Sequence, residues 1–215
     1  MVPGAARLRG VTEPHLRLAT RAIVLDPCDR ILLVRFDFGD RVVWATPGGG
    51  IEEGETDERA VRRELAEEAG LEEFELGPLV WTRTHHVPLG GGRWDGQTER
   101  YYLVRTPSFE PVPLLSWDEL RAEGMTAIRW WTPAELGAAE ELFAPRRLPL
   151  LVRELLLHGP PAEPVDVGVN RAAARRARGR GPSRCRSFRA SRLPLQRVLP
   201  SLDARARRES RRPRP

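Results

Sequence analysis

Three glutamates crowd one stretch of this chain and could do metal chemistry. The stretch runs from Gly48 to Leu71 and reads GGGIEEGETDERAVRRELAEEAGL. On a helix, Glu64, Glu67 and Glu68 would fall within an arc of roughly 100°. Carboxylates packed this closely repel one another unless a cation offsets their charge or one of them holds a proton. Oxygen ligands suit a hard ion such as Mg²⁺. The pattern predicts a divalent-metal site or, as the plainer alternative, an acidic helix face in water.

A helix from Asp57 to Ala69 must position these acids. Thr56 is a good N-cap, and negative charge follows it in the first turn. Gly70 stands where a left-handed residue would end the helix. One apolar stripe borders the acids and would dock on a sheet. It consists of Val61, Leu65 and Ala69.

The same stretch follows the pattern G-x(5)-E-x(7)-R-E-U-x-E-E-x-G-U, in which U is apolar, at every specified position. These positions are Gly49, Glu55, Arg63, Glu64, Leu65, Glu67, Glu68, Gly70 and Leu71. If each fixed residue had a one-in-ten chance, coincidence would be on the order of 1 in 10⁷ per start position. The pattern is the Nudix box, so the chain resembles the Nudix hydrolase family (MutT-like). Strand patterns on both sides extend the resemblance over residues 16–158.

The resemblance implies an α/β fold of the Nudix type, an α/β/α sandwich with a mixed sheet. The box helix would pack on one side of that sheet and a C-terminal helix on the other. It also implies a reaction, the hydrolysis of the pyrophosphate linkage of a nucleoside diphosphate joined to another moiety. Substrates of this class include ADP-ribose-like compounds, nucleotide sugars and (d)NTPs. The cofactor would be Mg²⁺ or Mn²⁺.

The resemblance also implies roles for individual residues. Glu67 and Glu68, with the carbonyl of Gly48, would hold the metals. Glu64 would complete this shell or accept the proton of the attacking water. Arg63 would orient Glu64 through a charge-assisted hydrogen bond, and Glu55 would extend that network.

One more carboxylate is expected from outside the box. Nudix hydrolases often recruit it from a loop that leads into a late strand. Glu123 is the candidate for this metal ligand, because it precedes a strand predicted over Met125 to Trp131, and Glu119 is the second choice. Simple surface exposure is the alternative for both.

The remaining elements follow from alternation, turn residues and helical periodicity. Arg17 to Leu25 and Arg30 to Phe36 predict a hairpin. Further strands are predicted over Val42 to Ala45, Glu73 to His86 and Glu99 to Thr106, and helices over Trp117 to Glu123, from Pro133, and over Arg146 to His158. The apolar face of the last helix is core or a contact in a homodimer. Trp130 and Trp131 should point to opposite faces of their strand.

The loop from Val87 to Thr98 is rich in glycine. Its Arg93 and Trp94 suggest a substrate wall with a ring for stacking on a base, or else an ordinary hairpin tip. His85 and His86 point to opposite faces of a strand, so we expect structural roles for both. Pro88 approximates a position at which some Nudix subfamilies place Pro or Tyr, which favours ADP-ribose-like substrates.

Charge divides the chain in two. Residues 170–215 hold 16 Arg against Asp203 and Glu209, a net charge of +14, which leaves residues 1–169 at −9. All 35 basic residues are Arg, which we attribute to a genomic coding bias. We predict a flexible leader over 1–15, one Nudix domain over 16–158 and a disordered basic tail over 159–215. The tail binds nucleic acid or an acidic partner, or it is an extension without function, which we favour.

Two cysteines, Cys28 and Cys185, make neither a disulfide framework nor a metal-binding spacing. Since no stretch approaches the ~20 apolar residues of a membrane span, we expect a cytoplasmic protein without membrane contact. Two rival functions stay open. One is a nucleotide-sensing regulator that does not turn over its ligand, against which the complete box argues. The other is an RNA-directed Nudix enzyme that uses the basic tail.

Overall fold

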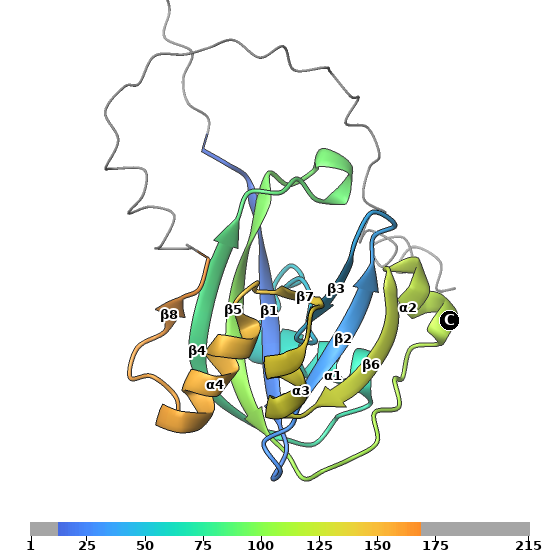
Figure 1. The fold of residues 1–215 in the computed structure, drawn as a ribbon. Coiled ribbons are helices and arrows are strands. Elements are labelled where there is room, and N and C mark those ends of the chain that lie inside the picture. Colours follow the sequence, from blue (N-terminus) through green and yellow to red (C-terminus); the bar gives the residue numbers. More distant parts are fainter. Residues whose placement is uncertain (1–12, 169–215) are drawn as a thin grey trace, which may run out of the picture.

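The computed structural model describes residues 13–168. This part of the chain contains eight strands and four α-helices (Figure 1). The strands are β1 (Leu16–Leu25), β2 (Ile31–Asp37), β3 (Val42–Ala45), β4 (Glu75–His85), β5 (Gly96–Arg105), β6 (Met125–Trp131), β7 (Leu142–Ala144) and β8 (Val165–Asp166). The helices are α1 (Asp57–Ala69), α2 (Trp117–Ala122), α3 (Pro133–Ala138) and α4 (Leu148–His158), with a short 3₁₀ turn, η1, at Gly90–Gly92.

The strands form one mixed sheet in the order β7-β3-β2-β1-β5-β4-β8, and β6 pairs with β2. The hairpin predicted for β1 and β2 closes only at its turn, where Leu25 pairs with Ile31. Along its length β1 instead pairs with β5, in parallel. The loop after β3 occupies the other edge of β1, because Ala22 N donates to Pro47 O and Thr20 N donates to Gly49 O, both at 2.9 Å. Because β1 and β2 separate beyond their turn, they leave room for this loop, residues 46–56, which we call the box loop.

Helices cover both faces of the sheet, which confirms the α/β/α sandwich. Figure 1 shows α3 and α4 in front of the sheet and α1 behind it. On the α1 side, Val61, Leu65 and Ala69 pack on apolar residues of β1, β2 and β5. On the other side, Leu148, Val152 and Leu155 of α4 join the larger core. Because the box helix is buried on its apolar stripe, its acidic residues lie at the edge of that core.

Sequence predicts some elements better than others. The bounds of α1, β3 and β6 are as predicted, and Trp130 and Trp131 belong to cores on opposite faces of the sheet. The short strands β7 and β8 were missed. Because β8 pairs with β4 at Trp81 and Thr82, the sheet continues past His158, the end we predicted for the domain.

The two ends of the chain are described only in part. Residues 1–12 and 169–215 lie outside the described residues, and with them most of the predicted leader and tail. At the end of the leader, His15 exchanges backbone and side-chain hydrogen bonds with Asp95. Between residues 13 and 168, no helix has the length and apolar character to cross a bilayer.

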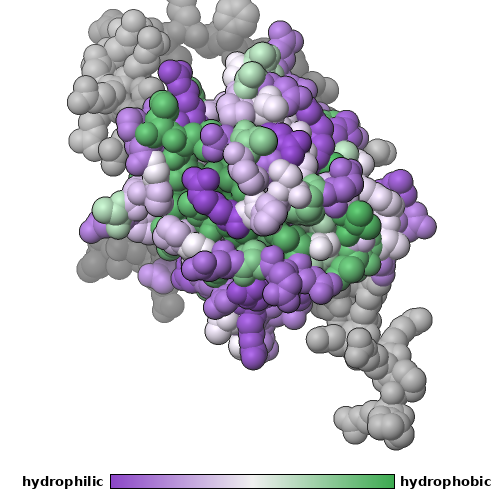
Figure 2. All heavy atoms as spheres, turned by 90° about the horizontal axis from the view of Figure 1, so that it is seen from below, coloured by the Kyte–Doolittle hydropathy of each residue, from purple (hydrophilic) through white to green (hydrophobic). Residues whose placement is uncertain are grey.

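Apolar side chains also reach the surface. Figure 2 shows such side chains from below, set among hydrophilic ones. Leu150 and Leu157 of α4 are exposed, although the opposite stripe of this helix is core as predicted. Of the two roles predicted for that stripe, the structure shows the core, and a homodimer stays a prediction.

Candidate active site

Local sequence determines both ends of the box helix. Thr56 Oγ1 accepts a hydrogen bond from Arg59 N at 3.3 Å, as an N-cap does. Gly70 has φ 69°, in the left-handed region, and its N–H donates to Ala66 O at 3.0 Å. Between these two ends, the stripe of Val61, Leu65 and Ala69 packs into the core, and Glu64 and Glu68 beside it are only 1% and 4% exposed.

The glycines of the box loop let the backbone touch these two acids. Gly48 N donates to Glu68 Oε2 at 2.8 Å. A Cβ on Gly49 would stand 2.4 Å from Glu64 Oε1, and one on Gly48 would stand 2.3 Å from Thr20 O. Any side chain at either position would therefore displace a carboxylate or a strand.

Arg63 ties the loop to the helix. It donates from Nε and Nη2 to the two carboxylate oxygens of Glu55, at 3.0 and 2.9 Å, and from Nη1 to Glu64 Oε1 at 2.7 Å. Its Nη2 also donates to Gly50 O at 2.9 Å, and Nη1 lies 3.5 Å from Glu67 Oε2. Burial alone would lower the pKa of Arg63, but Glu55 and Glu64 raise that pKa above its usual value. The guanidinium therefore stays charged.

The contact with Arg63 also changes the pKa of Glu55. Burial would raise the pKa of this carboxyl, but the hydrogen bonds from Arg63 hold it below its usual value. The charge-assisted network predicted from the sequence, with Arg63 between Glu55 and Glu64, is thus present.

The donors at this site suit a hard divalent cation. Two buried carboxylates, Glu64 and Glu68, meet the Gly48–Gly49 backbone, and Glu67 Oε2 is buried beside them. Oxygen donors of this kind are what Mg²⁺ and Mn²⁺ select. No three acidic, His or Cys side chains within residues 13–168 form a ready-made metal cluster. Glu64 and Glu68 are directed at Arg63 and at Gly48 N, respectively. The oxygen donors are of the type that this ion binds, and the carboxylates would reorient around the ion when it binds.

The two candidate acids outside the box have different settings. Glu119 completes a capping box at the start of α2, since its carboxylate accepts Ser116 N at 3.0 Å. Glu123 is the half-buried C-cap residue of α2, next to the corner where Asp37 N donates to Gly124 O at 2.8 Å. Glu119 therefore has a structural role, and Glu123 stays the candidate for the extra ligand.

Trp94, the predicted stacking ring, is already in contact with protein groups. Its ring centroid lies 4.2 Å from that of His15, and the guanidinium of Arg93 lies 5.3 Å from it. A base that stacked on the same face of Trp94 as His15 or Arg93 would displace that group. His86 is exposed and His85 is half-buried, and burial lowers the pKa of His85. A structural role for both histidines stays our interpretation.

Sequence reasoning missed a buried polar cluster on β1, β4 and β5. Its centre is Glu99, 3% exposed, which accepts Arg21 Nε at 3.1 Å and Arg83 Nη1 at 3.3 Å. Gln97 and Tyr101 lie on the same face of β5 and also donate to Glu99. The available signal was the period of two that places Gln97, Glu99 and Tyr101 on one face of a strand.

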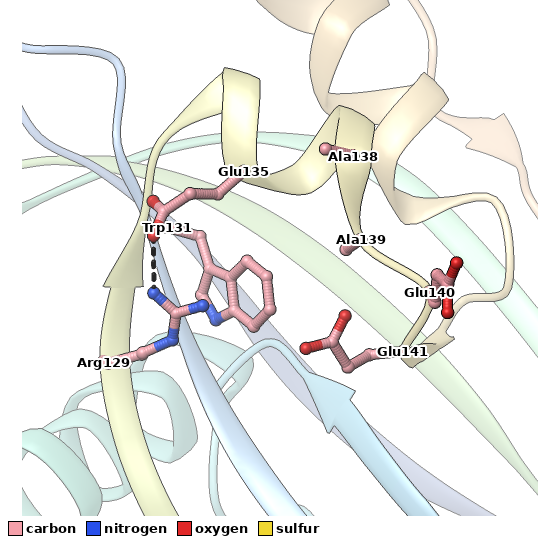
Figure 3. A pocket seen from close by; sticks show the side chains of 7 residues that line it. All are labelled: Arg129, Trp131, Glu135, Ala138, Ala139, Glu140 and Glu141. Carbon is pink, nitrogen blue, oxygen red and sulfur yellow. Dashed lines mark hydrogen bonds and ion pairs between the residues drawn. The ribbon is translucent and has the colours of Figure 1, made fainter.

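A hollow of about 700 Å³ lies beside α3, away from the box residues (Figure 3). Arg129 covers the ring of Trp131 at 3.6 Å and pairs with Glu135 at 2.9 Å. Exposed Glu140 and Glu141 line the other side. Since these carboxylates would repel a phosphate, the hollow does not suit a pyrophosphate substrate.

Comparison with known proteins assigns the family. The NUDIX domain family matches residues 15–153. The chain is 35% identical over 113 residues to an RNA pyrophosphohydrolase of Sulfurovum sp. (strain NBC37-1), which covers 44% of this chain and 71% of that protein. It is 34% identical over 104 residues to Nudix hydrolase 25 of Arabidopsis thaliana, which covers 43% of this chain and 59% of that protein.

The fold is shared with solved structures. A NUDIX family hydrolase from Clostridium perfringens superposes with a TM-score of 0.50 at 20% identity, over 65% of this chain and 97% of that chain. The complete box, the geometry of α1 and the match over residues 15–153 agree, and the chain belongs to the NUDIX domain family.

Proposed function

We propose that this protein is a Mg²⁺- or Mn²⁺-dependent hydrolase of the pyrophosphate linkage in a nucleoside diphosphate joined to another moiety. One observation carries the proposal. Glu64 and Glu68 are buried against the Gly48–Gly49 backbone, and Arg63 holds Glu64. Buried carboxylates that converge on one backbone loop are costly unless a cation offsets them, which a metal enzyme exploits.

Each box residue has a task in this proposal. The Gly48 carbonyl, Glu67 and Glu68 would hold the cation, and Arg63 keeps Glu64 in one orientation. A bound Mg²⁺ supplies charge neutralisation at the pyrophosphate oxygens and lowers the pKa of the attacking water. Glu64 completes the ligand set or accepts the proton of that water, and Glu123 is a second candidate for either task.

The reaction balances without a further reactant. The water oxygen forms a new bond to one phosphorus, and the bridging oxygen leaves with the electron pair of the broken P–O bond. The water proton passes to the base. The products are a nucleoside monophosphate and the phosphorylated remainder.

Two substrate classes compete. The position of Pro88 favours an ADP-ribose-like compound. The 5′ end of RNA is the second candidate, because the Sulfurovum relative is named an RNA pyrophosphohydrolase and residues 170–215 are strongly basic. Basic segments bind nucleic acid through phosphates, and salt weakens that binding. Deletion of residues 170–215 separates the two cases, since only activity on RNA should fall.

The deciding assay measures Mg²⁺-dependent product release from a panel of substrates. The panel contains NTPs, oxidised dNTPs, ADP-ribose, nucleotide sugars, NADH, dinucleoside polyphosphates and 5′-triphosphorylated RNA. Glu67→Gln should lower kcat by at least about a hundredfold on the best substrate. The control is Glu58→Gln on the same helix, because Glu58 is exposed and pairs with Arg62 at 2.9 Å. The proposal fails if no compound turns over, or if both variants keep the wild-type rate.

A further inference from the structure

Arg21 connects the box loop to the buried polar cluster of β5. Its Nη1 donates to the carbonyl oxygen of Gly48, and its Nε donates to Glu99 Oε1 at 3.1 Å. The side chain is only 16% exposed. One guanidinium therefore lies against the carbonyl that would serve as a metal ligand.

The cluster holds this guanidinium in place and keeps it charged. Glu99 Oε1 also accepts Gln97 Nε2 at 3.1 Å, and Glu99 Oε2 accepts the Tyr101 hydroxyl at 2.7 Å and Arg83 Nη1 at 3.3 Å. Burial would lower the pKa of Arg21, but the negative charges of Glu99 and Glu68 raise it above its usual value. With one carboxylate between two guanidiniums, the cluster has an excess of positive charge.

The Gly48 peptide does not depend on Arg21 for its position. Gly48 N is held by Glu68 Oε2 at 2.8 Å. The peptides on either side are held by β1, through Ala22 N to Pro47 O and Thr20 N to Gly49 O. What Arg21 adds at the carbonyl is a positive charge rather than geometry.

We propose that Arg21 competes with the divalent cation for the Gly48 carbonyl through its positive charge. In the substrate-free protein, its guanidinium weakens cation binding at that oxygen. A bound pyrophosphate brings negative charge that offsets the guanidinium. Cation and nucleotide therefore bind cooperatively, and each raises the affinity of the protein for the other by the same factor. The proposal rests on the proposed function, in which Gly48 is a ligand.

The test measures Mn²⁺ binding by calorimetry and by electron paramagnetic resonance, without turnover. Each protein is titrated with Mn²⁺ alone and again with α,β-methylene-ADP present. Arg21→Gln should tighten Mn²⁺ binding without nucleotide by about tenfold, the effect of losing one nearby, partly screened charge. In this variant, α,β-methylene-ADP should also increase the Mn²⁺ affinity less than it does in the wild type. Arg21→Lys keeps the charge and should resemble the wild type.

Two further variants make the test decisive. Arg83→Gln is the matched control, because Arg83 donates to Glu99 Oε2, whereas Arg21 donates to Glu99 Oε1 and to the Gly48 carbonyl. Mn²⁺ binding should therefore stay within about twofold of the wild type. Glu99→Gln removes the negative charge that faces Arg21, so it should weaken Mn²⁺ binding, whereas Arg21→Gln should tighten it. If Arg21→Gln does not fold, Glu99→Gln still tests the proposal.

The inference is overturned if Arg21→Gln leaves Mn²⁺ affinity unchanged or weakens it, or if Arg21→Lys behaves like Arg21→Gln. For Glu99→Gln, tighter binding is the overturning result. These outcomes are distinct from a failure of the proposed function, which shows as absent hydrolysis across the substrate panel whatever the Mn²⁺ affinity.

Discussion

Arg63 binds Glu55 with two nitrogens at once, Nε at 3.0 Å and Nη2 at 2.9 Å, while its third nitrogen holds Glu64 at 2.7 Å. Glu55 belongs to the loop before α1, and Glu64 belongs to the middle of that helix. A planar fork of donors is needed to serve both carboxylates, and of the cationic side chains only arginine has one. This pairing therefore fixes the acids of the loop and the helix relative to each other.

Arg63→Lys should damage both stability and catalysis. A lysine is a single point donor, so at least one of the carboxylates of Glu55 and Glu64 loses its charged partner, at a cost of about 2–3 kcal/mol in unfolding free energy. We expect kcat to fall at least about a hundredfold, since Glu64 loses its orientation. Urea unfolding and product release measure the two effects.

The matched control is Arg62→Lys on the same helix. Arg62 is half-exposed and pairs with Glu58 at 2.9 Å, so the loss of stability should stay below about 1 kcal/mol. Equal losses in the two variants would contradict the role of the Arg63 fork.

Gly70→Ala should destabilise the protein more than Gly54→Ala does. Both glycines have positive φ, 69° and 77°, so alanine costs about 1 kcal/mol at either position. At Gly70 a Cβ would also stand 2.1 Å from Val112 O, whereas at Gly54 it would meet no atom within 4 Å. We expect an extra loss of at least about 1 kcal/mol in Gly70→Ala by urea unfolding. If the two variants unfold at the same urea midpoint, the close contact between Gly70 and Val112 O is contradicted.

Tyr102 should make stability fall in alkali. Its hydroxyl donates to Asp57 Oδ2 at 2.5 Å, and burial and this hydrogen bond raise the pKa of Tyr102 to about 12. An unfolded tyrosine titrates near 10, so the folded state favours the protonated form. The contribution is complete below about pH 10 and is lost as the pH rises toward about 12. Because Tyr102 is only half-buried, we expect a contribution of about 1 kcal/mol.

Tyr102→Phe isolates this effect. The difference in unfolding free energy between wild type and variant should be constant from pH 8 to about 10 and vanish near pH 12. Subtraction removes the slope from Tyr101, whose pKa burial also raises. A difference that does not change with pH would exclude the hydrogen bond to Asp57 as its source.

Asp26→Asn should destabilise the turn between β1 and β2. Asp26 is 1% exposed and accepts Cys28 N, Arg30 N, Arg30 Nε and Ser108 Oγ at 2.7–2.9 Å. An amide has one acceptor oxygen instead of two and carries no charge, so we expect a loss of about 2–3 kcal/mol. Asp29→Asn is the control, because Asp29 is exposed with φ 58°, a conformation that asparagine tolerates.

The loss at Asp26 should depend on pH. Burial would raise the pKa of Asp26, but the hydrogen bonds from Arg30 and Ser108 hold it below its usual value. The charged form is thus favoured in the folded state, and its contribution is present above about pH 4 and lost as the pH falls through the folded pKa. The curves of wild type and Asp26→Asn should converge in acid, and curves that stay parallel down to pH 2 would contradict this assignment.

Sequence alone determined the box helix, because its signals are local. The cap at Thr56, the left-handed stop at Gly70 and the stripe of Val61, Leu65 and Ala69 all act within one helical segment. The same stretch also identified the family, since the residues of the Nudix box stand at fixed distances along the chain.

Tertiary structure alone decided what lies behind the box loop. Arg21 and Glu99 are 78 residues apart, and they meet because β1 pairs in parallel with β5 rather than along the length of β2. The short strands β7 and β8 likewise exist through pairing with β3 and β4. Such pairings depend on which edges of the sheet are left open, a property of the packed chain that no local pattern carries.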